Sequence, residues 1–275
     1  MVNTATSDPT NNNYDDVIVR RLYARGTWKV CSVAHFGGNE TDIADMCLLK
    51  DADGKPFIPG ASIAGAARSF LARQSQVWEK YKVGAETSAL KRLFGGDMRL
   101  GRKQSEKNED TMSALIIADA DCKQAETSIR DGVRVEHTSG SAAMGAKFDV
   151  EVVERGTEFN LSLECIIRRE DDQPSNKPNL EDLFLALLHA FQEGHIRLGA
   201  RTRRGYGRGK VPSWDIVDLQ MCNPEHVMTW LSGDIWSCNA NTNSERRKLK
   251  PRGLKTDCRK HFRIEADFAL QTSLL

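Results

Sequence analysis

The segment VIVRRLYARGTWKV, residues 17–30, carries the alternation of apolar and polar side chains that is typical of a β-strand with one face in a protein core. The expected inner face consists of Leu22, Ala24, Gly26, Trp28 and Val30. The expected outer face consists of Arg21, Tyr23, Arg25, Thr27 and Lys29. Because successive side chains of a strand point to opposite faces, the pattern predicts a half-buried strand with a basic outer face.

Two helices are predicted from capping residues and apolar stripes. Ser62 is placed to cap a helix through residues 63–74, and Asn179 is placed to cap a second helix that Gly194 closes. The apolar stripe of the first helix consists of Ile63, Ala66, Ala67 and Phe70.

Three further strands and a hairpin fill the rest of this part of the chain. The segment LIIADA, residues 115–120, reads as a buried strand, and FNLSLEC, residues 159–165, alternates as clearly as the first strand. GRGKVPSW, residues 207–214, reads as the last strand. Residues 131–152 form two strand-like arms around the small-residue apex SGSAAMG.

Without its insertions, this order is strand, helix, strand, strand, helix, strand. It predicts an α+β fold of the ferredoxin-like, or RRM-like, class, in which both helices cover one face of an antiparallel sheet. RNA-recognition modules use the open face of such a sheet for single-stranded nucleotides. The order alone is weak evidence for RNA binding, because the same fold hosts many functions.

The composition is that of an ordinary soluble protein. The chain has 275 residues, 40% of them hydrophobic and 28% charged, with a formal net charge of +1. No apolar run has the length of a membrane-spanning helix, and residues 1–16 form a polar tail without signal-peptide features, which we expect to be disordered. Seven cysteines in a chain of this size indicate reduced thiols and a cytoplasmic location. Since no long apolar run is present, we expect no membrane partner.

Positive charge and glycine are concentrated in HIRLGARTRRGYGRGKV, residues 195–211, which has four glycines and six Lys or Arg. Glycine lets the backbone approach a ligand closely, arginine matches phosphate geometry, and tyrosine stacks on bases. The residues expected to contact RNA here are Gly199, Arg201, Arg203, Arg204, Tyr206 and Arg208. The alternative is a solvated basic loop. A P-loop is excluded, because no GK[ST] follows and the segment comes after a helix.

Four segments together resemble one family. They are FIPGASIAGAARSFL (57–71), RLFGGD (92–97), VEHTSGSAAMGAKFDVEVVERGTEF (135–159) and LGARTRRGYGR (198–208). In this order and spacing they resemble the RAMP superfamily, and specifically the backbone subunit of type III CRISPR effector complexes, which act in antiviral defence. The resemblance covers about residues 17–216.

The resemblance implies a palm domain with a β-hairpin thumb at about residues 131–152, which binds guide RNA and target RNA beside other subunits or fused palms of a ribonucleoprotein complex. Such subunits cut target RNA next to a thumb-induced kink, with Mg²⁺ or Mn²⁺ and a loop aspartate. The matching aspartate is Asp45, which also serves as the tentative metal ligand. Further RNA contacts are implied at Ser62, Arg68, His137, Met144 and Lys147.

Two departures from the family pattern concern these contacts. Ala64 and Ala66 stand where related helices usually carry lysines, so Arg68 keeps the only charge there. Glu136 and His137 replace a usual Asp-Arg pair at the thumb, which keeps the acid but weakens the phosphate contact.

Several readings of the acid and histidine positions stay open. Asp42 competes with Asp45, and Asp45 alternatively belongs to a catalytically inactive scaffold subunit of the same complex. His35 is a candidate general base for a guide-RNA-processing endoribonuclease that needs no metal.

The last sixty residues contain an extension and basic linker (217–260) and a final amphipathic segment (261–275). Zinc-ligand residue types occur at Cys222, His226, Cys258 and His261, but no CxxC is present, so scattered reduced thiols are the simpler interpretation. The final segment, FRIEADFALQTSLL, resembles the first strand again, as if a second palm of a fused protein began there or the strand docked on a neighbouring subunit.

Overall fold

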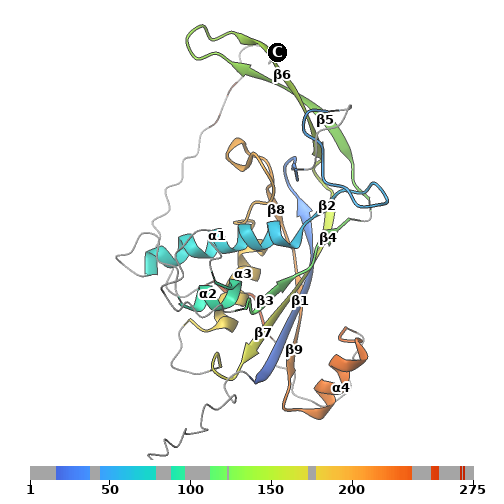
Figure 1. Ribbon diagram of the computed structural model, residues 1–275, viewed down its shortest axis with the longest axis vertical. Coiled ribbons are helices and arrows are strands. Elements are labelled where there is room, and N and C mark those ends of the chain that lie inside the picture. The colour runs from blue at the N-terminus through green and yellow to red at the C-terminus, as the bar shows by residue number, and fades with distance from the viewer. Residues whose placement is uncertain are drawn as a thin grey trace, which may run out of the picture.

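The computed structural model describes residues 17–37, 44–78, 88–96, 112–122, 124–172, 178–236, 249–253, 267 and 269. These residues form a mixed α+β body with antiparallel sheets, from one end of which a long β-hairpin projects (Figure 1). The tail expected over residues 1–16, the competing acid Asp42 and nearly all of the final segment lie outside the described residues.

The central sheet is built around the long first strand, β1 (Ile18–Val30). On one side β1 pairs with β7 (Glu158–Arg168), and β3 (Leu115–Ile117) adds to the far edge of β7. On the other side β1 pairs with β8 (Gly209–Lys210) at one end and β9 (Trp214–Gln220) along the rest. All of these pairings are antiparallel.

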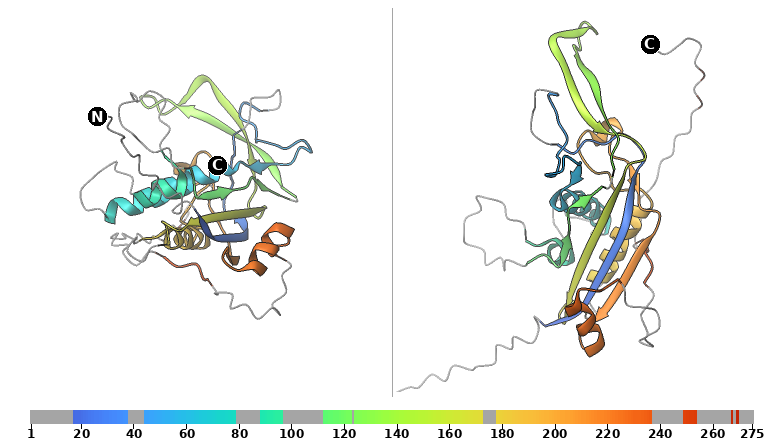
Figure 2. Two further views of the ribbon diagram at one scale, coloured as in Figure 1. Left: turned by 60° about the horizontal axis from the view of Figure 1, so that its bottom comes forward. Right: turned by 90° about the vertical axis from the view of Figure 1, so that its right-hand side faces the viewer.

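Helices lie on both faces of this sheet. α1 (Gly60–Trp78) and α3 (Leu180–Gln192) cover one face, with the short α2 (Ser88–Phe94) beside them. α4 (Pro224–Ser232) follows β9 and lies against the other face (Figure 2). The outer face of the sheet is therefore partly covered instead of fully open.

The core lies between the sheet and the first helix pair, as the alternation predicts. The buried strand residues are Leu22, Ala24, Trp28, Val30, Phe159, Leu161, Leu163 and Cys165. The predicted inner face is thus confirmed on β7 and, apart from the half-buried Gly26, on β1. From α3, Phe184 and Phe191 face them and are fully buried. Burial of such a side chain stabilises the fold by about 1.5–3 kcal/mol relative to exposure, so this layer supplies much of the stability.

The two helix caps turned out differently. The Asn179 side chain accepts a hydrogen bond from the Asp182 amide at 2.8 Å, which confirms the predicted cap of α3. The prediction for Ser62 is wrong, because α1 already begins at Gly60 and Ser62 lies in its first turn. The Gly60 amide instead donates to the Asp119 carboxylate at 2.7 Å, so the cap comes from a distant segment.

The last strand also differs from the expected one. Within residues 207–214, Gly209–Lys210 pair with β1 as the short strand β8, and Trp214, at the end of the expected segment, begins the longer strand β9. Pro212 lies between the two, and proline has no amide for a ladder. β9 stays paired to β1 as far as Gln220, so the expected palm boundary at residue 216 falls inside a strand.

The predicted hairpin is present and longer than expected. Its arms are β5 (Thr127–Val135) and β6 (Ala142–Val153), whose pairing shifts register near the tip. The turn covers residues 136–141, so Met144 lies on β6 and not in the turn. A two-residue pairing of β2 (Phe57–Ile58) with β4 (Ala120–Asp121) lies near its base.

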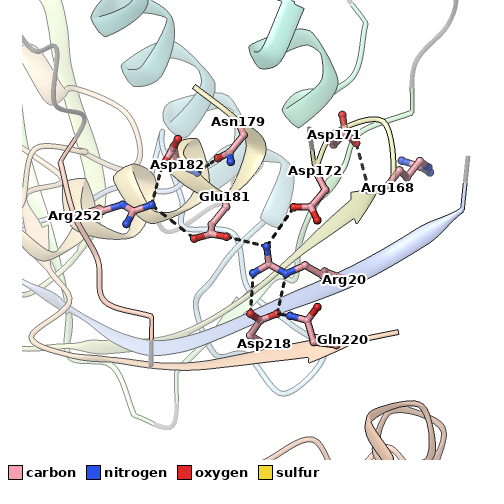
Figure 3. Close-up of polar contacts among 10 residues, drawn as sticks. All are labelled: Arg20, Arg168, Asp171, Asp172, Asn179, Glu181, Asp182, Asp218, Gln220 and Arg252. Carbon is pink, nitrogen blue, oxygen red and sulfur yellow. Dashed lines mark hydrogen bonds and ion pairs between the residues drawn. The ribbon is translucent and has the colours of Figure 1, made fainter. Parts of the chain in front are cut away.

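One buried ion cluster joins β1, β9 and α3 at the end of the sheet away from the hairpin (Figure 3). The Arg20 guanidinium donates to both carboxylate oxygens of Asp218 at 3.3 and 2.7 Å and to Glu181 at 2.8 Å. Arg252 donates to Asp182 at 2.7 Å, which fastens residues 249–253 to the start of α3. Burial alone lowers the pKa of Arg20, but the bonds and charges of Asp218 and Glu181 outweigh it and raise the pKa.

Candidate nucleic-acid interface

The cations on the outer face of the sheet are neutralised by acids of the same sheet. The ion pairs are Arg21 with Glu164, Arg25 with Asp215 and Lys29 with Glu158. Strand register explains two of them, since Arg25 lies opposite Asp215 and Lys29 opposite Glu158. Cross-strand pairs of opposite charge stabilise a sheet and remove its excess charge.

Tryptophans from the extension cover part of the same face. The Arg21 guanidinium lies 4.4 Å from the ring centroid of Trp230, and that of Arg25 lies 4.3 Å from that of Trp236. These cation–π contacts add to the ion pairs with Glu164 and Asp215 and hold both guanidinium groups against neighbouring side chains. An RNA-recognition module would bind RNA on this face. Here its charges are paired, and tryptophans from the extension cover part of it.

The glycine-rich segment is different, because three of its five arginines are exposed and make no ion pair within the described part of the chain. Arg203, Arg204 and Arg208 make no ion pair with any residue that the structure describes, and all three are solvent-exposed. Arg203 and Arg204 belong to the single 3₁₀ turn Thr202–Arg204, and Tyr206 follows half-buried. The segment thus gathers available positive charge, as the sequence predicts.

The glycines of this segment serve internal packing. Gly199 and Gly207 have positive φ angles of 90° and 71°. A Cβ atom at Gly199 would lie 2.4 Å from the carbonyl oxygen of His35, and one at Gly207 would lie 1.9 Å from that of Leu198. Close packing of the chain therefore explains why both positions are glycine, and the predicted RNA contact at the exposed Gly199 stays a prediction. Of the four glycines in this segment, only Gly205 would have no neighbouring atom within 4 Å of an added Cβ.

Hydrogen bonds connect the loop that carries Asp45 to β6, the second arm of the hairpin. The Asp149 amide donates to Asp45 Oδ2 at 2.9 Å, and the Met46 amide donates to the Asp149 carbonyl at 3.1 Å. The Glu151 amide donates to the Met46 carbonyl at 2.8 Å. Asp45 itself is exposed. These bonds fix an accessible carboxylate at the hairpin base.

Glu151 on β6 makes further bonds to the same loop, at residues that follow Asp45 in the chain. Its carboxylate accepts from the Leu48 amide at 3.0 Å and from Lys50 Nζ at 2.7 Å. Five hydrogen bonds, made by main-chain and side-chain groups, therefore hold this loop against β6.

Arg201 is the exception among the basic residues of the glycine-rich segment. Its guanidinium lies 4.6 Å from the ring centroid of Phe148 on β6, and its Nη2 lies 3.2 Å from Met46 Sδ. The residue is half-buried. It therefore touches both the hairpin and the Asp45 loop, and the structure brings these three parts together at one end of the sheet (Figure 1).

The remaining predicted contacts are spread over the hairpin and α1. His137 is exposed in the turn, and Met144 is fully exposed on β6. Lys147 pairs with Asp131 at 3.2 Å, which raises the pKa of the lysine, while both side chains stay in solvent. Ser62 is exposed in the first turn of α1, and Arg68 is half-buried two turns later.

His35 is poorly placed to act on a substrate. It is 1% exposed, and its Nδ1 lies 2.8 Å from the Glu151 carbonyl oxygen, which indicates an Nδ1–H donor. A general base must reach the proton that it removes. Its geometry fits a structural link between the segment that follows β1 and the hairpin strand β6.

The proposed zinc ligands are not brought together in the described part of the chain. Cys222 is exposed, whereas His226 is buried and its Nδ1 accepts from the Gln220 amide at 3.0 Å. Cys258 and His261 lie outside the described residues. Among the described residues, no three His, Cys, Asp or Glu side chains cluster as a metal site, and the five cysteines there are free thiols.

Comparison with protein families gives a single result. The model of the RAMP superfamily matches residues 29–210, about two thirds of the chain. The chain belongs to the RAMP superfamily. RAMP proteins occur in CRISPR complexes as RNA-binding subunits, and the matched residues include the end of β1, the Asp45 loop, the hairpin and the glycine-rich segment. A search of curated proteins returns no match.

The RAMP site contains residues that sequence reasoning missed. Phe148, Asp149 and Glu151 all lie on the second hairpin arm and hold the Asp45 loop or Arg201. The signal was the acid-apolar alternation DVEV at residues 149–152, which is unusual for a two-sided exposed hairpin. None of the helices in the described regions of this RAMP is both long and apolar enough to cross a membrane.

Proposed function

We propose that this RAMP is the backbone subunit of a type III CRISPR effector complex, which holds guide RNA and cuts target RNA at Asp45. The observation that carries the proposal is the position of Asp45, an exposed carboxylate fixed at the hairpin base within the unit that also presents unpaired arginines.

The topology supports a ferredoxin-like palm. The strand order β3-β7-β1-β8, with α1 between β1 and β3 and α3 between β7 and β8, is the order of a split βαβ fold. The hairpin is inserted between β4 and β7, and its projection beyond the sheet suits a thumb that reaches a neighbouring palm (Figure 1).

The charge distribution supports RNA binding at the same end. Phosphate contacts by Arg and Lys supply most of the affinity for a nucleic acid backbone. The outer sheet face has its cations paired, whereas Arg203, Arg204 and Arg208 are unpaired among the described residues. We therefore place the RNA backbone along the glycine-rich segment and not across the sheet.

Asp45 has the environment of a single-carboxylate magnesium ligand. Its Oδ2 accepts the Asp149 amide, and no described residue bonds to Oδ1. Mg²⁺ in nucleic-acid enzymes is usually bound by one or two carboxylates together with phosphates and water. A bound divalent ion would neutralise phosphate charge during cleavage. Asp45 would hold that ion, and the Asp149 amide would keep the carboxylate turned toward the RNA.

For this reaction the protein has to hold the attacking 2′-oxygen in line with the leaving 5′-oxygen. When the RNA backbone is kinked, the 2′-oxygen attacks the adjacent phosphorus as the 2′-hydroxyl proton passes to solvent or to a base, and the bond from phosphorus to the 5′-oxygen breaks as that oxygen takes up a proton from solvent. The products are a 2′,3′-cyclic phosphate and a 5′-hydroxyl end. Holding the attacking and leaving oxygens in line is worth several kcal/mol of the barrier, up to about 7–11 kcal/mol.

Target cleavage by the reconstituted complex tests the proposal. We expect Asp45→Asn to abolish one or more cuts while RNA affinity stays within about twofold of wild type. Asp53→Asn, which removes an exposed acid from a nearby turn, is the matched control and should cut normally. EDTA should stop cleavage, and Mg²⁺ or Mn²⁺ should restore it with cyclic-phosphate ends.

Two results would contradict this function. Unchanged cutting by Asp45→Asn would make the chain a scaffold subunit whose neighbours do the chemistry. Cleavage of precursor guide RNA in EDTA, lost in His35→Ala, would make it a guide-processing endoribonuclease, against the buried position of His35.

A further inference from the structure

We propose that Arg201 is a positioning residue that clamps the hairpin and the Asp45 loop together, and not a phosphate contact like its neighbours. The proposal rests on the proposed function insofar as it concerns cleavage. It assigns to one arginine of the glycine-rich segment a role different from that of Arg203 and Arg204.

The backbone at Arg201 is the first sign of this role. Its φ of 56° is the only positive value at a non-glycine residue among those that the structure describes. Arginine rarely adopts this left-handed conformation, whereas glycine does so freely. The surrounding segment uses glycine at each of its other left-handed positions, so a side chain at residue 201 has a reason to be present.

The side chain makes two contacts that a phosphate-binding arginine would not need. Its guanidinium lies over the Phe148 ring at 4.6 Å, and its Nη2 lies 3.2 Å from Met46 Sδ. Planar stacking on an aromatic ring is a property of arginine that lysine does not share. Arg203, Arg204 and Arg208 have no such partner in the described structure.

Phe148 carries the contact onward to the first hairpin arm. The ring lies across Gly132 of β5, where a Cβ atom would be 2.3 Å from two ring atoms. Gly132 is paired directly with Phe148 in the hairpin ladder. Arg201 therefore rests on a ring that spans both arms at the hairpin base.

Met46 carries the contact to the catalytic acid. It follows Asp45 directly, and its amide and carbonyl bond to β6 at Asp149 and Glu151. The Arg201 guanidinium contacts the Met46 side chain, while the Met46 main chain makes these bonds to β6. A chain of contacts thus links the orientation of the hairpin to the position of the Asp45 carboxylate. It runs from Gly132 through Phe148, Arg201 and Met46 to Asp45.

This arrangement predicts that Arg201 affects the rate of cutting and not the affinity for RNA. Arg201→Lys keeps the positive charge and the backbone conformation but loses the planar face. We expect single-turnover cleavage at saturating RNA to fall at least tenfold, with Kd within about twofold of wild type. Exchange of the Met46 and Asp149 amides with deuterium should become faster.

Three further variants keep the test decisive. Arg201→Gly removes the side chain and relieves the positive φ, so it should fold and show the same loss as Arg201→Lys. Arg25→Lys, which also takes a guanidinium off an aromatic ring but on the outer face of the sheet, is the matched control and should match wild type in every readout. Arg203→Ala should show the opposite pattern: weaker binding, a salt slope about 0.7 smaller, and wild-type exchange of the Met46 and Asp149 amides.

Amide exchange separates this inference from the proposed function. Faster exchange at Met46 and Asp149 in Arg201→Lys and Arg201→Gly supports the clamp even where Asp45→Asn cuts normally. Wild-type exchange in both variants overturns the clamp. Full activity of Arg201→Lys together with loss of RNA affinity in Arg201→Gly also overturns it, and identifies Arg201 as a phosphate contact.

Discussion

The Arg20 cluster should be a main support of the palm, and Arg20→Met tests this. The Arg20 side chain is 8% exposed, and its partners Asp218 and Glu181 are 2% and 5% exposed (Figure 3). The substitution leaves two buried carboxylates without their cation. Gln220 and Arg252 offset this only in part, at 3.1 Å from Asp218 and 3.7 Å from Glu181.

Breaking a buried pair by removal of one partner costs about 3–5 kcal/mol. We expect Arg20→Met to lie in this range, against a total stability of about 5–15 kcal/mol for a typical domain. The matched control is Arg25→Met, which removes an arginine from the same strand. Its pair with Asp215 is exposed, and such pairs contribute less than about 1 kcal/mol.

Urea unfolding of the full chain, followed by tryptophan fluorescence, measures both variants. The midpoint should shift strongly for Arg20→Met and little for Arg25→Met, with similar m-values. Where Arg20→Met is too unstable to purify, Arg20→Lys keeps the charge but loses the fork to Asp218 and should show a smaller shift. Equal shifts for Arg20→Met and Arg25→Met would refute the reasoning.

Two smaller predictions concern the loop and the hairpin. Gly207→Ala should destabilise by about 2–4 kcal/mol, because a Cβ meets the Leu198 carbonyl, whereas Gly205→Ala should lose only about 1 kcal/mol for its positive φ; equal thermal shifts would contradict this. Hydrogen bonds from Ser128 and Arg130 lower the pKa of Glu154, so Ser128→Ala should raise its NMR titration midpoint toward that of free glutamate. An unchanged midpoint would contradict it.

The sign of the Glu154 effect on stability follows from the lowered pKa. Because the folded pKa lies below the unfolded one, Glu154 contributes stability at a pH above its unfolded pKa. That contribution is lost as the pH falls through the folded pKa. The protection factors of the β5 and β6 amides, which correct for the slower intrinsic exchange in acid, should therefore fall as the pH is lowered, and fall less in Ser128→Ala.

Local patterns in the sequence predicted the sheet and the hairpin well. Alternation is a property of each strand alone, so the buried faces of β1 and β7 followed directly from it. The Asn179 cap also depends on residues only three positions apart. Features of this kind need no knowledge of the rest of the fold.

Contacts between distant segments could not be predicted in this way. Arg20 and Asp218 are 198 positions apart, and the α1 cap at Gly60 comes from Asp119. The packing of Gly207 against Leu198 is visible only once the loop is folded. The sequence likewise grouped Arg201 with the other loop arginines, because its contact with Phe148 spans two separate motifs.

The central claim is that RNA lies along the glycine-rich segment and not across the outer face of the sheet. Two double variants with equal loss of charge test it: Arg203→Gln with Arg204→Gln, and Arg25→Gln with Lys29→Gln. RNA affinity is measured by fluorescence anisotropy over a range of salt concentrations. Two lost phosphate contacts on single-stranded RNA lower the salt slope by about 1.4.

We predict that the first pair weakens binding and lowers the slope by this amount, while the second pair leaves both near wild type. Weaker binding and a smaller slope in the second pair alone would place the RNA on the sheet and contradict the account.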